Sequence, residues 1–258
     1  MRYIADFHLH SKYSRATSPQ IDLDNLDKWA RFKGIQIIGT TDFTHPLWFK
    51  EIKTKLEPLN NGLFKLKTAK DNAVYFILTT EVSCVYTKNG RGRRVHLVVI
   101  FPDLASVEKF NTQLSWTGNL KSDGRPMLGM DAKEILKMAL EISPEAFIVP
   151  AHIWTPWYSV FGSKSGFDSL EECFDEMAKN IYAIETGLSS DPPMNWRLSQ
   201  LDRVSFISCS DGSNSSFFVL ISCFGFFPFE MPLNFFDRGV LGFFCPFFFF
   251  TLENIFIF

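Results

Sequence analysis

The chain has 258 residues, which is enough for one large α/β domain or two small ones. Its formal net charge is −2 at pH 7, so the chain as a whole lacks the positive field that favours nonspecific nucleic-acid binding, although a local basic groove is compatible with this total. The five cysteines are widely spaced and form no C-x-x-C pair, which argues against a zinc ribbon or a disulfide framework and suits a reducing cytosol. The N-terminal run MRYIADFHLH lacks a signal-peptide pattern, so we expect a cytoplasmic protein that needs no membrane.

Strand-like and helix-like patterns alternate along residues 1–211. In chain order we expect a strand at 2–6, a helix at 22–32, a strand at 35–40, a helix at 47–59, strands at 74–80 and 95–101, helices at 103–114 and 131–142, a strand at 146–150, a helix at 170–179, and strands at 181–185 and 204–209. Gly90 and Gly92 between the third and fourth strands predict a β-hairpin. Residues 117–129 are polar and glycine-rich, which predicts a loop near the active face. The alternation favours a parallel sheet or a (β/α) barrel over an all-β fold.

The composition changes after Asp211. More than half of the 29 phenylalanines lie within 217–258. A membrane anchor would need about 20 uninterrupted apolar residues, and the runs here are shorter or are interrupted by Asp237 and Arg238. A packed extension of the core is a second interpretation, but the runs have neither helical nor strand periodicity. We favour a third, in which 1–211 is the domain and 212–258 is an aberrant tail from a shifted or misassembled reading frame rather than a native domain.

All five histidines lie at or beside apolar stretches that we expect to be strands. His8 and His10 form the run DFHLH, and the others are His45, His96 and His152. The H-x-H spacing puts both imidazoles on one face of a strand, because side chains repeat every two residues. Imidazole is a common ligand of zinc, manganese and iron. The set predicts a centre with more than one metal ion at one rim of a sheet or barrel.

Carboxylates lie beside the same strands. Asp42, Glu81, Glu185 and Asp211 stand at or near the ends of expected strands, whereas His96 stands near the start of one. In a β/α barrel the strand ends converge on the rim where sites form. Glu81 and Asp211 can bridge ions because a carboxylate has two oxygens and a negative charge, and we assign both to catalysis. Mixed histidine and carboxylate ligands suit zinc, manganese or iron better than magnesium. Ions about 3.5–4 Å apart activate water and stabilise the charge that develops in phosphoester hydrolysis.

Each of these residues also has a purely structural interpretation. A lone H-x-H pair is a weak signal of metal, and His45 could be a loop residue hydrogen-bonded to backbone. Asp42 is a candidate ligand or a group that orients one. Glu185 could cap a helix or orient a histidine, and we prefer these interpretations to direct ligation of a metal ion. Taken together and in this order, the residues favour a metal centre.

A basic cluster lies beside His96. It consists of Arg91, Arg93 and Arg94, with Lys164 as a further basic residue in the run FGSKSG. These side chains are either solvated residues at a hairpin tip or contacts for the phosphates of a polyanionic substrate. Trp154 and Trp157 follow His152, and they either pack at the rim or stack on a base. We take all six as candidate substrate-binding residues.

Together these strings resemble the polymerase and histidinol phosphatase (PHP) superfamily of metal-dependent phosphoesterases. The matching strings are DFHLH with Ser11, TTDFTHP, the isolated Glu81, VHLVVIF, PAHIW and ISCSD. The chain more narrowly resembles endonuclease Q through FILTTEVSCVY, RRVHLVVIFPD, VPAHIWTPW, FGSKSGFDSLEECF and IETGLSSDPPMNWRLSQLD. The resemblance covers residues 1–211.

The resemblance implies a distorted (β/α) barrel of the PHP type with a metal cluster at the C-terminal rim of the strands. It also implies an endonuclease that nicks DNA 5′ of a deaminated base or an abasic site, so damaged DNA is the expected partner. One ion would be held by His8, His10, Glu81 and Asp211. Glu81 would bridge to a second ion held by His96 and His152. Asp42 and His45 occupy the region that members use for a third ion.

The expected cofactors are therefore two or three divalent ions of zinc, manganese or iron, with magnesium a further candidate during turnover. The sequence departs from the superfamily pattern at three places. Phe43 stands where many members have histidine, and Gly212 and Ser213 stand where the family continues with Ala-His. Nothing after Asp211 resembles the further C-terminal region with which members grip DNA.

Three functions remain open from the sequence. The first is a DNA repair endonuclease of the endonuclease Q type, and the second is a phosphatase for a small phosphomonoester. The third is an inactive remnant that binds metal or nucleic acid without turnover. The basic hairpin and its aromatic neighbours fit an extended polyanion better than a small substrate.

Overall fold

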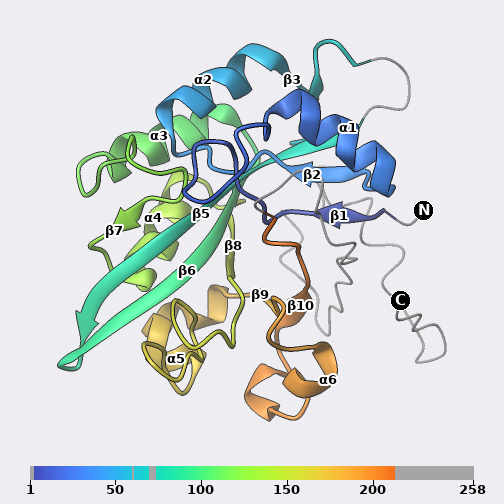
Figure 1. Ribbon diagram of the computed structural model, residues 1–258. Coiled ribbons are helices and arrows are strands. Elements are labelled where there is room, and N and C mark those ends of the chain that lie inside the picture. The colour runs from blue at the N-terminus through green and yellow to red at the C-terminus, as the bar shows by residue number, and fades with distance from the viewer. Residues whose placement is uncertain (1–2, 60, 70–73, 213–258) are drawn as a thin grey trace.

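The computed structural model describes residues 3–59, 61–69 and 74–212 (Figure 1). Apart from Gly212, the expectations for the phenylalanine-rich tail lie outside the described residues. Within the described part of the chain, no helix is long and apolar enough to cross a membrane.

The strands form one eight-stranded sheet and a separate parallel pair. The main path runs through β1 (Ala5–Asp6), β2 (Ile37–Gly39), β5 (Tyr75–Lys88), β4 (Phe64–Leu66) and β3 (Leu56–Pro58). β6 (Arg91–Phe101) pairs with β5 and with β8 (Phe147–Pro150), and β7 (Met127–Leu128) pairs with β5. The separate pair consists of β9 (Ala183–Glu185) and β10 (Ser205–Ile207).

A few isolated contacts join the β9–β10 pair to the sheet, near β8 on one side and near β1 on the other. After β8, the Ile153 N–H donates to the Glu185 carbonyl at 2.9 Å. On the other side, the Ser210 N–H donates to the Asp6 carboxylate at 3.2 Å, and Leu9 forms an isolated parallel bridge with Gly212. The mixed α/β class is therefore confirmed. Among the described residues the strand ladders do not close, so the distorted barrel stays a prediction.

The expected helices are present, and three of them begin after an aspartate that caps the first turn. Asp22, Asp103 and Asp131 each accept a hydrogen bond from a backbone N–H of the first turn. The helices that they cap are α1 (Leu23–Lys33), α3 (Leu104–Leu114) and α4 (Ala132–Ile142). In Figure 1, α1, α2 (Pro46–Lys55) and α3 lie together along one side of the sheet. Two short elements, α6 (Pro192–Asn195) and a 3-10 turn (Ser199–Leu201), lie between β9 and β10.

Two expected helices are shorter than the sequence pattern suggested. The helix expected at 47–59 ends at Lys55, because the next residues form β3 and pair with β4, which buries Leu56 and Leu66. The helix expected at 170–179 divides into α5 (Leu170–Phe174) and a 3-10 helix (Asp175–Asn180). Asp175 breaks the helix at φ 48°, and its carboxylate pairs with the ammonium groups of Lys88 and Lys133 at 3.0 Å each. Both boundaries depend on partners that are distant in sequence.

The β5–β6 hairpin is longer than expected and reaches well out of the body (Figure 1). Its turn consists of Asn89 and Gly90, both with positive φ, as a tight two-residue hairpin turn requires. The outer part of β6, which reads RGRR, has no apolar side chain, and the outer residues of β5 are half-buried or exposed, so a local apolar pattern could not reveal this part of the hairpin as strand. As a consequence, Glu81 and His96 lie inside β5 and β6, and the expectation that Glu81 follows the end of one strand and that His96 stands near the start of the next is wrong.

Two apolar clusters lie on opposite faces of the sheet. The larger packs the helices against the sheet. The smaller takes residues from β1, β2, β5, β6, β8, β9 and β10; its members there include Ala5, Ile37, Ile77, Val98, Val149, Ala183 and Ile207. Ile77 and Glu81 are four residues apart on β5, and side chains of a strand alternate between faces. Glu81 therefore lies on the same face as the smaller cluster, which forms the apolar base of the site.

Candidate metal centre

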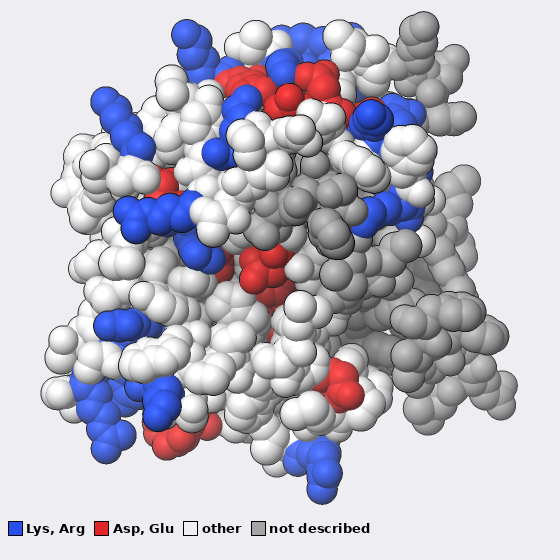
Figure 2. All heavy atoms as spheres, in the orientation of Figure 1, with Lys and Arg blue, Asp and Glu red and all other residues white. Residues whose placement is uncertain are grey.

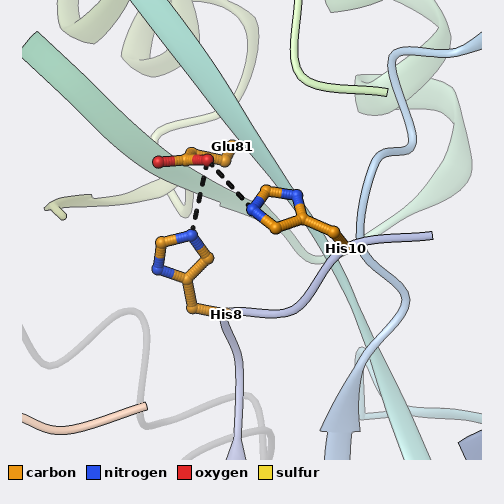
Figure 3. Close-up of side chains that lie close together, drawn as sticks. All are labelled: His8, His10 and Glu81. Atoms are coloured by element: carbon orange, nitrogen blue, oxygen red, sulfur yellow. Dashed lines mark ion pairs between the residues drawn. The ribbon is translucent and has the colours of Figure 1, made fainter. Parts of the chain in front are cut away.

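His8 and His10 project from the segment that follows β1. Both are buried, and Leu9 between them points into the larger core cluster, as alternation along an extended segment requires. Figure 3 shows both imidazoles directed at the Glu81 carboxylate. The His8 Nε2 lies 3.5 Å and the His10 Nε2 lies 3.3 Å from Glu81 Oε2. These three side chains form the first ligand group.

His96 and His152 form a second group around the other oxygen of the same carboxylate. His96 lies opposite Ser83 in the β5–β6 ladder and Glu81 lies opposite Val98, so Glu81 and His96 are diagonal neighbours on one face. The His96 Nδ1 is 2.6 Å and the His152 Nε2 is 3.3 Å from Glu81 Oε1. Glu81 is therefore shared, with one carboxylate oxygen directed at each pair of histidines.

Asp211 joins the first group from the segment after β10. Its Oδ1 lies 3.1 Å from His10 Nε2 and 3.5 Å from His8 Nε2. The Asp211 side chain is 40% exposed, whereas that of Glu81 is fully buried. Asp211 is therefore the carboxylate of this centre that reaches solvent.

Hydrogen bonds to neighbouring groups fix the tautomers of three histidines. The His8 Nδ1 donates to the Glu185 carboxylate at 2.9 Å, and the His10 Nδ1 contacts Asp42 Oδ1 at 3.4 Å. The Thr155 hydroxyl donates to a backbone carbonyl at 2.8 Å and therefore accepts from His152 Nδ1 at 3.0 Å. In the neutral form of each imidazole the proton is therefore on Nδ1 and the Nε2 lone pair faces Glu81, which is the arrangement that metal-binding histidines use.

The arrangement fits a divalent metal ion. Within each group, one ligand atom from every residue lies within 4.8 Å of the others. The His8 Nε2 is buried and has no hydrogen-bond partner among the described residues, which is costly for a polar atom unless something else binds it. Neutral imidazoles with carboxylates are a ligand set typical of zinc and of other first-row transition metals.

In the second group, burial and neighbouring charges have opposing effects on the pKa of each residue. Burial lowers the pKa of His96 to about 4, despite the adjacent Glu81 charge, so this imidazole is neutral at pH 7 and able to donate its lone pair. Burial alone would raise the pKa of Glu81, but the charges that His96 and His8 carry at acid pH outweigh it and hold that pKa well below the ordinary value. The shared carboxylate is therefore ionised.

The first group is more basic when no metal is bound. Burial would lower the pKa of His8, but the charges of Glu185 and Glu81 raise it well above the ordinary value. Burial also opposes protonation of His10, but its hydrogen bonds with Asp211 and Asp42 raise its pKa to about 9. Metal binding at neutral pH would therefore displace protons from this group.

Asp42 and His45 lie outside both ligand groups. Asp42 is fully buried, and its Oδ2 accepts from the Ser11 N–H at 2.6 Å and the Ser14 hydroxyl at 2.7 Å. His45 stacks on Tyr13 with ring centroids 4.2 Å apart, and its buried Nδ1 has no partner among the described residues. Phe43, which stands between them, packs in the core. The structure thus places Asp42 as a group that orients His10.

The candidate substrate-binding residues fall into two sets. The Arg93 guanidinium donates to the Gly166 carbonyl and lies 4.1 Å from the Phe167 ring centroid, and the Trp154 indole donates to Asn195 at 2.8 Å, so both side chains have intramolecular partners. The other members are exposed: Arg91, Arg94, Lys164 and Trp157. Figure 2 shows acidic atoms near the middle of one face, with Lys and Arg atoms along their left side.

Arg125 is a site residue that the sequence interpretation missed. Its Nη1 donates to Glu81 Oε2 at 3.0 Å, and its side chain is 34% exposed. It belongs to the loop 117–129, which was expected near the active face. A basic residue in a polar, glycine-rich loop was the available signal, but no local pattern showed where that side chain would point.

Known proteins resemble this chain in fold and in sequence. No protein-family model matches the chain. A crystal structure of the lesion-specific endonuclease Q of Pyrococcus furiosus matches with 32% identity and a TM-score of 0.72, covering 83% of this chain and 49% of that one. A structure of endonuclease Q with a 27-mer duplex carrying an abasic lesion at the active site matches equally well. A candidate metal-dependent phosphoesterase of Bifidobacterium adolescentis shares the fold at a TM-score of 0.53 and 13% identity.

Two curated proteins also match in sequence. An uncharacterized protein of Methanocaldococcus jannaschii is 32% identical over 152 residues, which are 58% of this chain and 16% of that protein. The uncharacterized protein YqxK of Bacillus subtilis is 28% identical over 225 residues, covering 80% of this chain and 54% of that protein. The chain thus spans about half or less of the length of these relatives. In fold and in sequence the chain therefore resembles endonuclease Q over most of its described length, and it shares its fold with a candidate metal-dependent phosphoesterase, which supports the resemblance to the PHP superfamily.

Proposed function

We propose that residues 1–211 form a metal-dependent phosphoesterase domain that hydrolyses phosphodiester bonds in DNA, nicking 5′ of a deaminated base or an abasic site. The observation that carries this proposal is the sharing of Glu81 by two histidine pairs, one at each carboxylate oxygen. The 32% identity to endonuclease Q over 83% of the chain supports DNA as the substrate. A distorted barrel is part of the proposal, because single contacts already join β9 and β10 to both margins of the sheet.

In this proposal His8, His10, Glu81 and Asp211 hold one ion, and Glu81, His96 and His152 hold a second. Zinc, manganese or iron fits these ligands, and magnesium remains a candidate during turnover. When bound, such ions lower the pKa of a water molecule and offset the charge that develops on the phosphoryl oxygens.

Hydrolysis adds a water oxygen to phosphorus and breaks the bond from phosphorus to one sugar oxygen, while the water loses a proton and the leaving oxygen gains one. The Oδ1 of Asp211 faces His8 and His10, so Oδ2 is the oxygen suited to accept the proton of the water. In the metal-free protein burial opposes the ionisation of Asp211, but the hydrogen bond with His10 and the charge of His8 lower its pKa, so its carboxylate is ionised at neutral pH before metal binds. It is also the carboxylate of the centre that reaches solvent.

The exposed basic residues offer a path for a DNA strand toward the centre. Arg94 and His96 are two residues apart on β6 and therefore share a face. The Arg94 guanidinium lies 5.1 Å from the centroid of the exposed Trp157 ring, and Lys164 lies in the same loop as Trp157. Cationic side chains contact phosphates and an exposed indole stacks on bases, so this surface suits a polyanionic strand.

The test is turnover of end-labelled duplexes that contain deoxyinosine, uracil, an abasic site or no lesion, with an aryl phosphate as the small-molecule alternative. The chain is loaded with zinc or manganese, and Glu81→Gln is compared with Glu171→Gln, a control at an exposed ion pair with Arg203. Nicking of lesion duplexes that is lost in Glu81→Gln and retained in Glu171→Gln supports the proposal. Turnover of the aryl phosphate alone indicates a small-molecule phosphatase, and metal binding without either activity indicates a remnant.

A further inference from the structure

Arg125 holds the one guanidinium that contacts the shared carboxylate among the described residues. Its Nη1 lies 3.0 Å from Glu81 Oε2, the oxygen that also faces His8 and His10. A guanidinium has five N–H donors in a fixed planar fork, and within the described part of the chain Glu81 is its only hydrogen-bond partner. About a third of the side chain is exposed, so it stands between the buried centre and solvent with donors to spare.

The backbone that carries Arg125 is tied to the segment that carries His10. The Gly124 N–H donates to the Tyr13 carbonyl at 3.0 Å, and the Thr44 hydroxyl donates to the Gly124 carbonyl at 3.1 Å. The Asp123 carboxylate accepts from the Arg125 N–H at 3.1 Å and from the Arg15 N–H at 3.3 Å. The Arg125 guanidinium is therefore carried by a loop whose backbone is held in place by these hydrogen bonds.

Gly124 allows this loop to approach so closely. A Cβ at this position would clash with Asp42 Oδ2 and with the Ser14 hydroxyl oxygen. Glycine therefore lets the loop lie directly on the Asp42 carboxylate that orients His10. The loop that carries Arg125 thus packs directly against Asp42, which contacts the proposed metal ligand His10.

A role as the counter-charge of Glu81 does not account for this placement. Four imidazoles already surround the Glu81 carboxylate, and the bound ions would supply further positive charge at both of its oxygens. A guanidinium that keeps its charge at all working pH values is then in excess over what one carboxylate needs. A phosphate group at the centre would supply the missing anion, since its two non-bridging oxygens match the guanidinium fork.

We propose that Arg125 is a catalytic residue that binds a non-bridging oxygen of the phosphate undergoing hydrolysis. This inference rests on the proposed function and adds a substrate ligand to it. Arg125 stabilises the negative charge that grows on that oxygen as water adds to phosphorus. Its contact with Glu81 and the Asp123–Gly124 backbone hold the fork in place before substrate arrives, so little reorganisation is needed during the reaction.

The test compares Arg125→Gln and Arg125→Lys with the wild-type chain. Arg31→Gln is the matched control, because Arg31 pairs with Asp27 on the surface of α1. Removal of one preorganised donor lowers kcat/KM by about 100-fold or more. We therefore expect Arg125→Gln to lose about that much and Arg125→Lys to recover only part of it, because lysine keeps the charge without the fork. Metal content, measured by mass spectrometry, should stay at the wild-type level in all three variants.

Binding of inorganic phosphate to the zinc-loaded chain gives a readout that does not depend on turnover. Isothermal titration calorimetry should show phosphate binding that weakens at least about tenfold in Arg125→Gln and is unchanged in Arg31→Gln. Loss of metal from Arg125→Gln would overturn the inference, because Arg125 would then support Glu81. Equal phosphate affinity of Arg125→Gln and the wild type would also overturn it. If the wild type turns over no DNA, the proposed function fails, and the phosphate titration still decides the role of Arg125.

Discussion

Replacing Glu185 by glutamine tests how much the orientation of a metal-binding histidine contributes to metal affinity, because the substitution removes no histidine. The buried Glu185 carboxylate accepts from His8 Nδ1 at 2.9 Å and from the His152 backbone N–H at 2.8 Å. It therefore contacts one histidine of each ligand group and is itself in neither. Glutamine has nearly the same shape, but it has one acceptor oxygen and no charge.

The expected loss of affinity follows from the hydrogen bonds that glutamine can keep. Both donors converge on Oε2, and His8 Nδ1 also lies 3.0 Å from Oε1. A glutamine oxygen at the Oε2 position can keep both bonds, but the amide nitrogen then faces His8 Nδ1 and the negative charge that holds His8 is lost. Changes at groups that orient metal ligands lower metal affinity by about 10–100-fold, which corresponds to about 1.4–2.7 kcal/mol. We expect the zinc affinity of Glu185→Gln to fall within this range, while the number of ions bound at saturation is unchanged.

Competition with a chromogenic zinc chelator measures this affinity directly. Glu171→Gln is the control, since it removes a carboxylate of the same kind from an exposed pair with Arg203. A zinc affinity for Glu185→Gln within about threefold of the control would refute the reasoning, because an orienting hydrogen bond of this kind affects the ligand that it holds. Loss of one whole equivalent of zinc would instead make Glu185 a ligand.

Three further outcomes can be measured on the same chain. Gly187 has φ +59°, and a Cβ there would lie 2.6 Å from the His152 Cβ, so Gly187→Ala should lower both thermal stability and metal affinity; an unchanged melting curve would contradict this. Replacing Arg91 and Arg94 by serine should weaken DNA binding regardless of sequence and flatten the salt slope by about 1 for each phosphate that is no longer neutralised, whereas an unchanged slope would leave the hairpin a solvated tip. The pKa of His10 is raised to about 9 in the metal-free protein, so its contribution to stability is complete below the unfolded value near 6.5 and is lost as the pH rises through about 9. The Tm of the metal-free protein should therefore decrease as the pH rises from about 6.5 to about 9. A Tm that does not change over this pH range would refute the raised pKa of His10.

Most of the α/β pattern could be predicted because it depends on local signals. The aspartate caps of α1, α3 and α4 and the apolar strands are visible in short windows of sequence. The outer part of the β5–β6 hairpin could not be predicted in the same way, because its residues are half-buried or exposed and lack an apolar period. The same limit explains why Glu81 and His96 were expected at strand ends although both lie inside strands.

The candidate site was partly visible for a related reason. His8 and His10 share a face through strand alternation, which is local, and the structure brings both to Glu81. Arg125 depends on the packing of the loop 117–129 against the segment after β1, which is a contact across more than a hundred residues. The contacts of Asp42 with His10 and of Glu185 with His8 likewise come from tertiary packing, so the sequence could suggest these residues without deciding between a metal ligand and a group that orients one.

Glu81 joins two metal sites in this proposal, and counting metal ions in the purified chain tests that most directly. After reconstitution with zinc or manganese, we expect about two ions per chain in the wild type. Glu81→Gln should lose at least one of them, because each ligand group contains one oxygen of this carboxylate. Fewer than about 0.2 equivalents in the reconstituted wild type, or two ions retained in Glu81→Gln with unchanged affinity, would contradict a centre organised around Glu81.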